Sequence, residues 1–120
     1  LAAAHASLCI MTDANDPRLV YITCPNETEA LAIARALVAE RLAGSVNVLG
    51  QARSIYRWQG KIEDAAEVVL IARTRAGRME ALIARTRALH SYVCPCIVAV
   101  PIAEGPLDYL AWLTEETTEQ

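Results

Sequence analysis

Residues 45–74 read SVNVLGQARSIYRWQGKIEDAAEVVLIART, and this stretch decides the fold. Short runs rich in apolar and β-branched residues predict strands over 45–49, 54–58 and 67–74. Gln59-Gly60 suits a two-residue hairpin turn, and Gly50 is expected to allow a bend or bulge. The stretch therefore predicts one long antiparallel hairpin.

The predicted hairpin is longer than the helices that flank it in the sequence. A helix of about 14 to 17 residues extends about 21–26 Å at roughly 1.5 Å per residue. A strand of about 14 residues reaches about 45 Å. The tip, with Tyr56, Trp58 and Ile62, is thus expected to project beyond the domain. Because a two-stranded ribbon with large apolar side chains is not stable bare in water, we expect a neighbouring subunit to cover it.

The same periodicities predict the remaining elements, with Asn26 and Gly44 as the caps of the first helix. They are a strand over 19–24, helices over 26–43 and 76–89, a strand over 96–100 and a C-terminal helix from Pro106. This order predicts an α+β, ferredoxin-like βαββαβ sandwich with an additional C-terminal helix. Residues 1–17 are expected to form an N-terminal extension, and residues 18–120 a single domain.

Composition excludes several classes of protein. The 120 residues are 54% hydrophobic and 21% charged, with a net charge of -3, which is a globular composition without a strong pull toward nucleic acid. No apolar run approaches the roughly 20 residues that cross a bilayer. The four cysteines are not spaced like a small disulfide scaffold, so we expect reduced thiols and a cytoplasmic protein.

Five arginines fall close together between residues 73 and 87, whereas Lys61 is the only lysine. One interpretation is a solvated helix face opposite an acidic C-terminal end. The other is an anion-binding surface. The clustered arginines are Arg73, Arg75, Arg78, Arg85 and Arg87.

His90, Cys94 and Cys96 form the one dense group of soft-metal ligand types. An extended segment would place both sulfurs on one face, where they could bind Cu(I) or Zn(II) with His90 as a third ligand. The alternative is that His90 caps the preceding helix and the cysteines are small packing residues.

Evidence for catalysis is weak. Cys24 precedes a helix N-terminus, which can lower a thiol pKa, but it is equally a small apolar core residue. No residue pattern supplies an acid, a base and a nucleophile together, so we do not expect an enzyme. Five aromatic residues form either a small-molecule cleft or an interface core. They are Tyr56, Trp58, Tyr92, Tyr109 and Trp112.

The order and spacing of several motifs resemble the CutA family over about residues 19–113. These motifs include Thr23-Cys24-Pro25, the run from Ser54 to Ile62, Leu89-His90-Ser91-Tyr92 followed by Pro95, and Tyr109-Leu110 with Trp112. The resemblance implies a homotrimer of ferredoxin-like subunits, linked to tolerance of divalent metals such as copper. It implies no settled enzymatic reaction.

The resemblance also sharpens the metal prediction, because Cys96 stands where the family usually has an acidic residue. We expect a trimeric divalent-cation-tolerance protein that binds copper, zinc or another soft metal through His90, Cys94 and Cys96. The alternative is a non-catalytic trimeric signalling or scaffold module that binds a small anion or a partner protein between its subunits. Neither hypothesis involves nucleic acid or a membrane.

Overall fold

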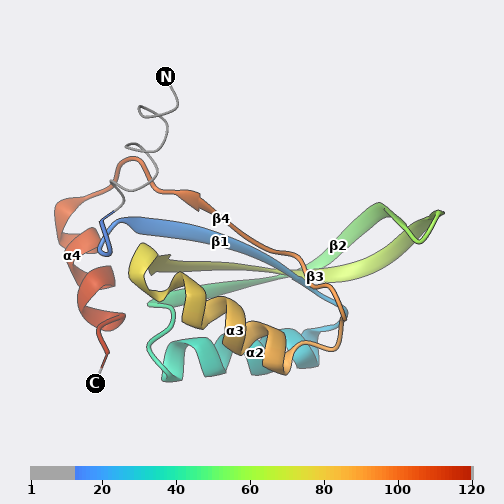
Figure 1. Cartoon of the computed structure of the whole chain (residues 1–120), viewed down its shortest axis with the longest axis horizontal. Coiled ribbons are helices and arrows are strands. Elements are labelled where there is room, and N and C mark those ends of the chain that lie inside the picture. The colour runs from blue at the N-terminus through green and yellow to red at the C-terminus, as the bar shows by residue number, and fades with distance from the viewer. Residues whose placement is uncertain (1–12, 120) are drawn as a thin grey trace, which may run out of the picture.

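The structure, a computed structural model, describes residues 13–119, so residues 1–12 of the predicted extension lie outside it. Its sheet is antiparallel with strand order β2-β3-β1-β4, and the predicted ferredoxin-like fold is confirmed (Figure 1). In chain order the elements are β1 (Pro17–Cys24), α2 (Glu27–Ala39), β2 (Ser45–Trp58), β3 (Lys61–Arg75), a 3-10 turn (Ala76–Arg78), α3 (Met79–Leu89), β4 (Ile97–Pro101) and α4 (Leu107–Glu116).

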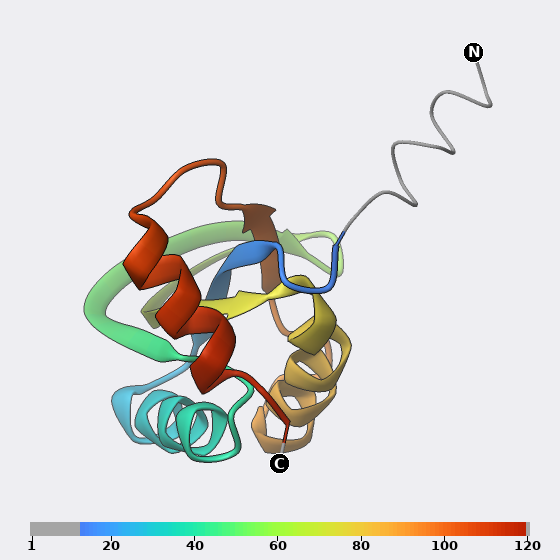
Figure 2. The ribbon, with the colours of Figure 1, turned by 90° about the vertical axis from the view of Figure 1, so that its left-hand side faces the viewer.

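One face of the sheet carries the hydrophobic core. Val20, Ile22 and Cys24 alternate along β1 and are fully buried under α2 and α3, which lie side by side on that face (Figure 2). Leu37 of α2 and Leu82 of α3 close the same core. The packing of two helices on one face of the sheet thus buries the main hydrophobic core.

The opposite face of the sheet remains open. The pairing register places Tyr21, Leu49, Val98 and Val100 on this side, and all four are exposed. The remaining helix, α4, packs at one end of the sheet (Figure 1). A contiguous apolar sheet face left in water typically marks an interaction surface.

The hairpin of β2 and β3 protrudes as predicted. Its strands have 14 and 15 residues, and its tip extends beyond the ends of α2 and α3 (Figure 1). Gln59 and Gly60 both take positive φ, of 50° and 80°, between the paired Trp58 and Lys61. This is the two-residue hairpin turn that the sequence predicts.

A bulge in β2 changes which side chains of the hairpin face the open side. Leu49 pairs with Val69, but Ala52 pairs with Glu67, so β2 holds one extra residue between these pairs. The bend predicted at Gly50 is thus present, although the positive φ of 62° falls on Gln51. Because side chains alternate along a strand, the extra residue reverses the faces of the rest of β2.

The first helix begins as predicted but ends earlier. Asn26 Oδ1 accepts a hydrogen bond from the Glu29 backbone N–H over 2.9 Å, which is the expected cap. The helix stops at Ala39, and Arg41 takes the positive φ of 61° that turns the chain. The prediction that Gly44 caps this helix was therefore wrong. Gly44 instead allows α4 to approach, because a Cβ there would lie 2.7 Å from Leu113 Cδ1.

Candidate functional site

A hollow of about 680 Å³ lies where the hairpin leaves the open face of the sheet, and we call it the hairpin hollow. Its size is within the range of small-molecule sites. Three strands and the connection between α3 and β4 form its lining. The lining residues are Tyr21 and Thr23 of β1, Ser54, Tyr56 and Trp58 of β2, Glu67 of β3, and Ser91, Tyr92, Val93, Cys94 and Cys96 of the connection.

The β2 bulge brings the aromatic side of the hairpin to this hollow. Ala52 and Glu67 face the open side as a pair, so Ser54, Tyr56 and Trp58 follow on the same face. If β2 kept the same sequence and alternated regularly from Leu49 without a bulge, Ile55 and Arg57 would face this side instead. The register of the hairpin, and not only its sequence, therefore determines the chemistry of the hairpin hollow.

Glu67 is the one charged residue in the lining and is only 5% exposed. Its Oε2 accepts a hydrogen bond of 2.9 Å from the Tyr92 hydroxyl. Burial, this hydrogen bond and the charge of Glu67 raise the pKa of Tyr92, so its hydroxyl stays protonated and donating. Within residues 13–119, no ion pair joins Glu67 to a basic side chain.

His90 does not line the hairpin hollow, but its ring packs against the lining residue Tyr92 and its side chain is fully buried. The Tyr92 backbone N–H donates to its Nδ1 over 3.1 Å, so Nε2 carries the hydrogen and donates to the Thr23 carbonyl over 2.7 Å. Glu29 Oε2 lies 3.5 Å from the same Nδ1. Both ring nitrogens are thus engaged within the chain, and the imidazole holds the α3–β4 connection against β1.

Cys94 and Cys96 are exposed, carry free thiols and line the hairpin hollow together. Partial burial and the charge of Glu67 raise the pKa of Cys96, so its thiol holds its proton in the free protein. The structure thus brings together two of the three predicted ligands. In the described range 13–119, no group of three or more His, Cys, Asp or Glu side chains is placed to hold a metal ion.

For Cys24, the structure favours the second of the two interpretations of the sequence, a small apolar core residue. It is fully buried in the core, where burial and the charges of Glu29 and Glu67 raise its pKa to about 12. The following helix N-terminus does not activate this thiol, because the cost of burying a thiolate outweighs the helix dipole. Its burial and its raised pKa favour the interpretation of Cys24 as a small packing residue of the core.

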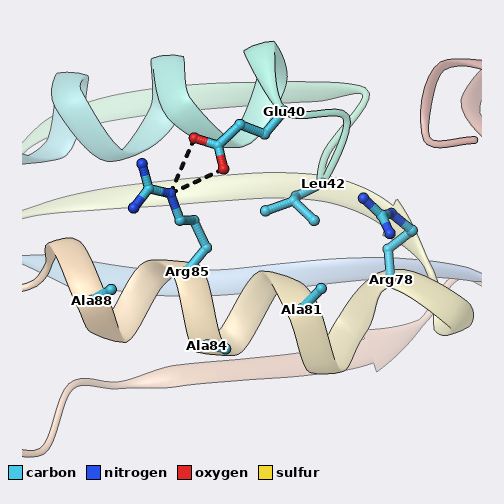
Figure 3. A pocket seen from close by; sticks show the side chains of 7 residues that line it. All are labelled: Glu40, Leu42, Arg78, Ala81, Ala84, Arg85 and Ala88. Carbon is cyan, nitrogen blue, oxygen red and sulfur yellow. Dashed lines mark hydrogen bonds and ion pairs between the residues drawn. The ribbon is translucent and has the colours of Figure 1, made fainter. Parts of the chain in front are cut away.

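The clustered arginines bind groups of their own chain. Arg85 Nε donates to both carboxylate oxygens of Glu40 at 3.0 Å, across a groove between α2 and α3 that Ala81, Ala84 and Ala88 also line (Figure 3). Arg78, at the end of this groove, pairs with Glu119 at 2.7 Å. Intramolecular pairing of this kind favours the interpretation of a solvated charged face over an anion-binding surface.

Glu67 and Tyr21 are site residues that the functional analysis of the sequence missed. Glu67 directly precedes the apolar run 68–72, and an acidic residue next to a buried strand is a feature of the sequence that could have marked it as a site residue. Its burial, however, depends on Tyr92, which lies 25 residues away in sequence.

The fold and the site together define a class: a small ferredoxin-like α+β protein with an uncovered sheet face, a projecting hairpin and a hollow lined by thiols and aromatic rings. The family model of the CutA1 divalent ion tolerance protein matches residues 18–116, and the chain belongs to this family. Within the described residues, no helix combines the length and the apolar character needed to cross a membrane.

Relatives of known name support the assignment. The divalent-cation tolerance protein CutA of Thermus thermophilus is 48% identical over 99 residues, which cover 82% of this chain and 96% of that protein. Protein CutA of Homo sapiens is 41% identical over 97 residues, 81% of this chain and 54% of that protein. The crystal structure of CutA from Xylella fastidiosa superposes with a TM-score of 0.84 at 44% identity, covering 86% of this chain and 99% of that one.

Proposed function

We propose that this chain is a subunit of a homotrimer that binds a soft metal ion, copper or zinc, as its part in divalent-cation tolerance. The observation that carries the metal site is the pair of free, exposed thiols of Cys94 and Cys96 in the hairpin hollow. Thiolate sulfur prefers Cu(I) and Zn(II) over magnesium and calcium. Membership of the CutA1 family supports a role that involves divalent ions.

The donor set fits copper better than zinc. Zinc usually takes four protein ligands in a closed site, whereas the residues from 13 to 119 offer no group of three. In the predicted set, His90 has no free nitrogen, so we propose that it positions the segment that carries Cys94 and Cys96. Any further ligand would come from another subunit.

Two uncovered surfaces support the homotrimer. The open sheet face exposes Tyr21, Val98 and Val100, and the hairpin tip exposes Ile55 and Ile62. Contact with other copies would bury both surfaces, as the resemblance to CutA proteins implies. Light scattering on a sizing column tests this proposal, and a monomer at micromolar concentration contradicts it.

The metal site is tested by comparing the wild type with Cys94→Ser/Cys96→Ser under reducing conditions. Calorimetry with Zn(II) and a Cu(I) competition assay should show a loss of affinity in the double variant. Ser54→Ala changes the lining without removing a thiol and is the matched control. Because binding displaces thiol protons, affinity should fall as pH decreases. Equal affinities of wild type and double variant remove these cysteines from the site.

The alternative is a trimeric signalling or scaffold module that binds a small anion or a partner protein. A small anion gains no support from the hairpin hollow, whose one charged lining residue is the acidic Glu67. We propose a binding role and not catalysis, because the thiol of Cys24 and the hydroxyl of Tyr92 both hold their protons. The three free thiols of the described chain favour a reducing compartment, and we propose the cytoplasm.

A further inference from the structure

We infer that the hairpin hollow binds a small organic ammonium ion, with Glu67 as its counter-ion and aromatic rings as its walls. This goes beyond the proposed metal site, because it depends on Glu67, Tyr56 and Trp58 and needs neither thiol.

The first argument is the state of Glu67. Glu67 is only 5% exposed to solvent, and its Oε2 accepts one hydrogen bond, from the Tyr92 hydroxyl. Among residues 13–119, Glu67 Oε1 accepts no hydrogen bond and forms no ion pair with a basic side chain. It is not one of the fully buried unpartnered atoms, so it reaches the solvent of the hairpin hollow. A recessed carboxylate without a cation attracts a positive ligand to the oxygen that remains accessible.

The second argument is the wall of the hairpin hollow. Tyr21, Tyr56, Trp58 and Tyr92 line it together with Glu67. The face of an aromatic ring carries negative charge density and attracts a cation, most strongly when water is excluded. Several rings around one carboxylate select a cation that also has apolar surface, as an alkylated ammonium ion does.

The third argument concerns the kind of cation. Hard metal ions such as Ca²⁺ and Mg²⁺ require about six oxygen ligands, and Glu67 is the only carboxylate in the lining. A soft metal would be held by Cys94 and Cys96, which are separate groups from the carboxylate and the rings. The volume of about 680 Å³ exceeds the needs of a bare ion and suits a small organic molecule.

Choline and its uncharged isostere 3,3-dimethyl-1-butanol are the probes that test this inference. Calorimetry on the full chain should show that choline binds about tenfold or more tightly than the isostere, since the two differ in charge and not in shape. Binding should also change the fluorescence of Trp58, observed alone in Trp112→Phe, because the chain has two tryptophans. Equal affinity for the two probes in the wild type overturns the inference.

Substitutions test which side chains cause the preference for choline over the uncharged isostere. Glu67→Gln keeps the size of the side chain and should abolish the preference for choline over the isostere. The matched control is Glu63→Gln, which should retain the preference; Glu63 lies on β3 like Glu67 and pairs with Tyr56 of β2. Trp58→Leu should weaken choline binding, and it serves as the test if Glu67→Gln does not fold. An unchanged preference in both Glu67→Gln and Trp58→Leu overturns the inference.

Two further variants distinguish the ammonium site from the proposed metal site and from a hollow that is filled by a second subunit. Cys94→Ser/Cys96→Ser should retain choline binding even though it loses the proposed metal, so failure of one proposal is distinguishable from failure of the other. Lys61, at the hairpin tip, is the one lysine that another subunit could insert against Glu67. Choline binding that occurs in Lys61→Gln and is absent in the wild type would show that a second copy fills the hairpin hollow, and would overturn the inference.

Discussion

The hydroxyl of Tyr92 donates a hydrogen bond to Glu67 Oε2 over 2.9 Å, and this contact joins the α3–β4 connection to the central strand β3. His90 fixes the same connection to β1 through the Thr23 carbonyl. Because the two contacts act on the neighbouring residues 90 and 92, the connection, β1 and β3 form a single hydrogen-bonded unit beside the hairpin hollow.

Removal of the Tyr92 hydroxyl should destabilise this unit. We expect Tyr92→Phe to lower the free energy of unfolding by about 1–3 kcal/mol, since it leaves Glu67 Oε2 without its donor. Urea denaturation measures the change. Tyr109→Phe, whose hydroxyl has no hydrogen bond among the described residues, is the control. A loss of the same size in a Glu67→Ala background, which has no side-chain acceptor, would show that the contact contributes nothing.

Trp58→Ala should weaken assembly. Trp58 is 44% exposed in the single chain, and covering it in a subunit interface would contribute roughly 1.5–3 kcal/mol per subunit. The variant should melt at a lower temperature and dissociate at higher protein concentration in light scattering. Arg35→Ala, on the exposed side of α2, should change neither property. Unchanged assembly in Trp58→Ala would mean that Trp58 stays in solvent.

Gly44→Ala should destabilise the contact between α4 and the start of β2. The added Cβ would lie 2.7 Å from Leu113 Cδ1 and 3.4 Å from Trp112, and relief of this overlap costs about 1–3 kcal/mol. Gly50→Ala is the matched control, because no atom lies within 4 Å of its added Cβ. Thermal unfolding compares the two variants, and equal melting temperatures would contradict the packing argument.

Stability should fall in alkaline solution because of Cys24. Its folded pKa of about 12 lies above the ordinary thiol value of 9.0, so its contribution is complete below pH 9 and is lost as pH rises toward 12. In that interval the unfolded chain ionises the thiol and the folded chain does not. Cys24→Ala should be less stable at neutral pH but should lose less stability between about pH 8 and pH 10. Parallel pH profiles of the two proteins would rule out this origin.

Local sequence patterns predict most of the fold. The turn at Gln59-Gly60 and the cap at Asn26 each depend on residues close in sequence, and both are confirmed. The predicted end of the first helix was wrong because the chain turns at Arg41, and arginine has no marked preference for positive φ. The bulge predicted at Gly50 is confirmed between Leu49 and Ala52, but its positive φ lies on Gln51, a residue type that likewise has no marked preference for it.

The candidate site is predicted less completely, because its contacts join distant parts of the chain. The sequence places His90 beside Cys94 and Cys96, but the partner of His90 Nε2 is Thr23, 67 residues away. That contact engages the ring nitrogen that a metal would otherwise use. Glu67 likewise becomes important through its burial and through Tyr92, and neither is visible in the pattern around position 67.

The extra residue between Leu49 and Ala52 has a consequence for how this surface can change during evolution. Deletion of Gln51 would remove the bulge and restore regular alternation, with Leu49 still opposite Val69 and Ala52 still opposite Glu67. Ser54, Tyr56 and Trp58 would therefore stay on the open face, and only the local bend would be lost. A change of one residue in length should thus be better tolerated at this position than elsewhere in the hairpin, where it would move side chains to the other face.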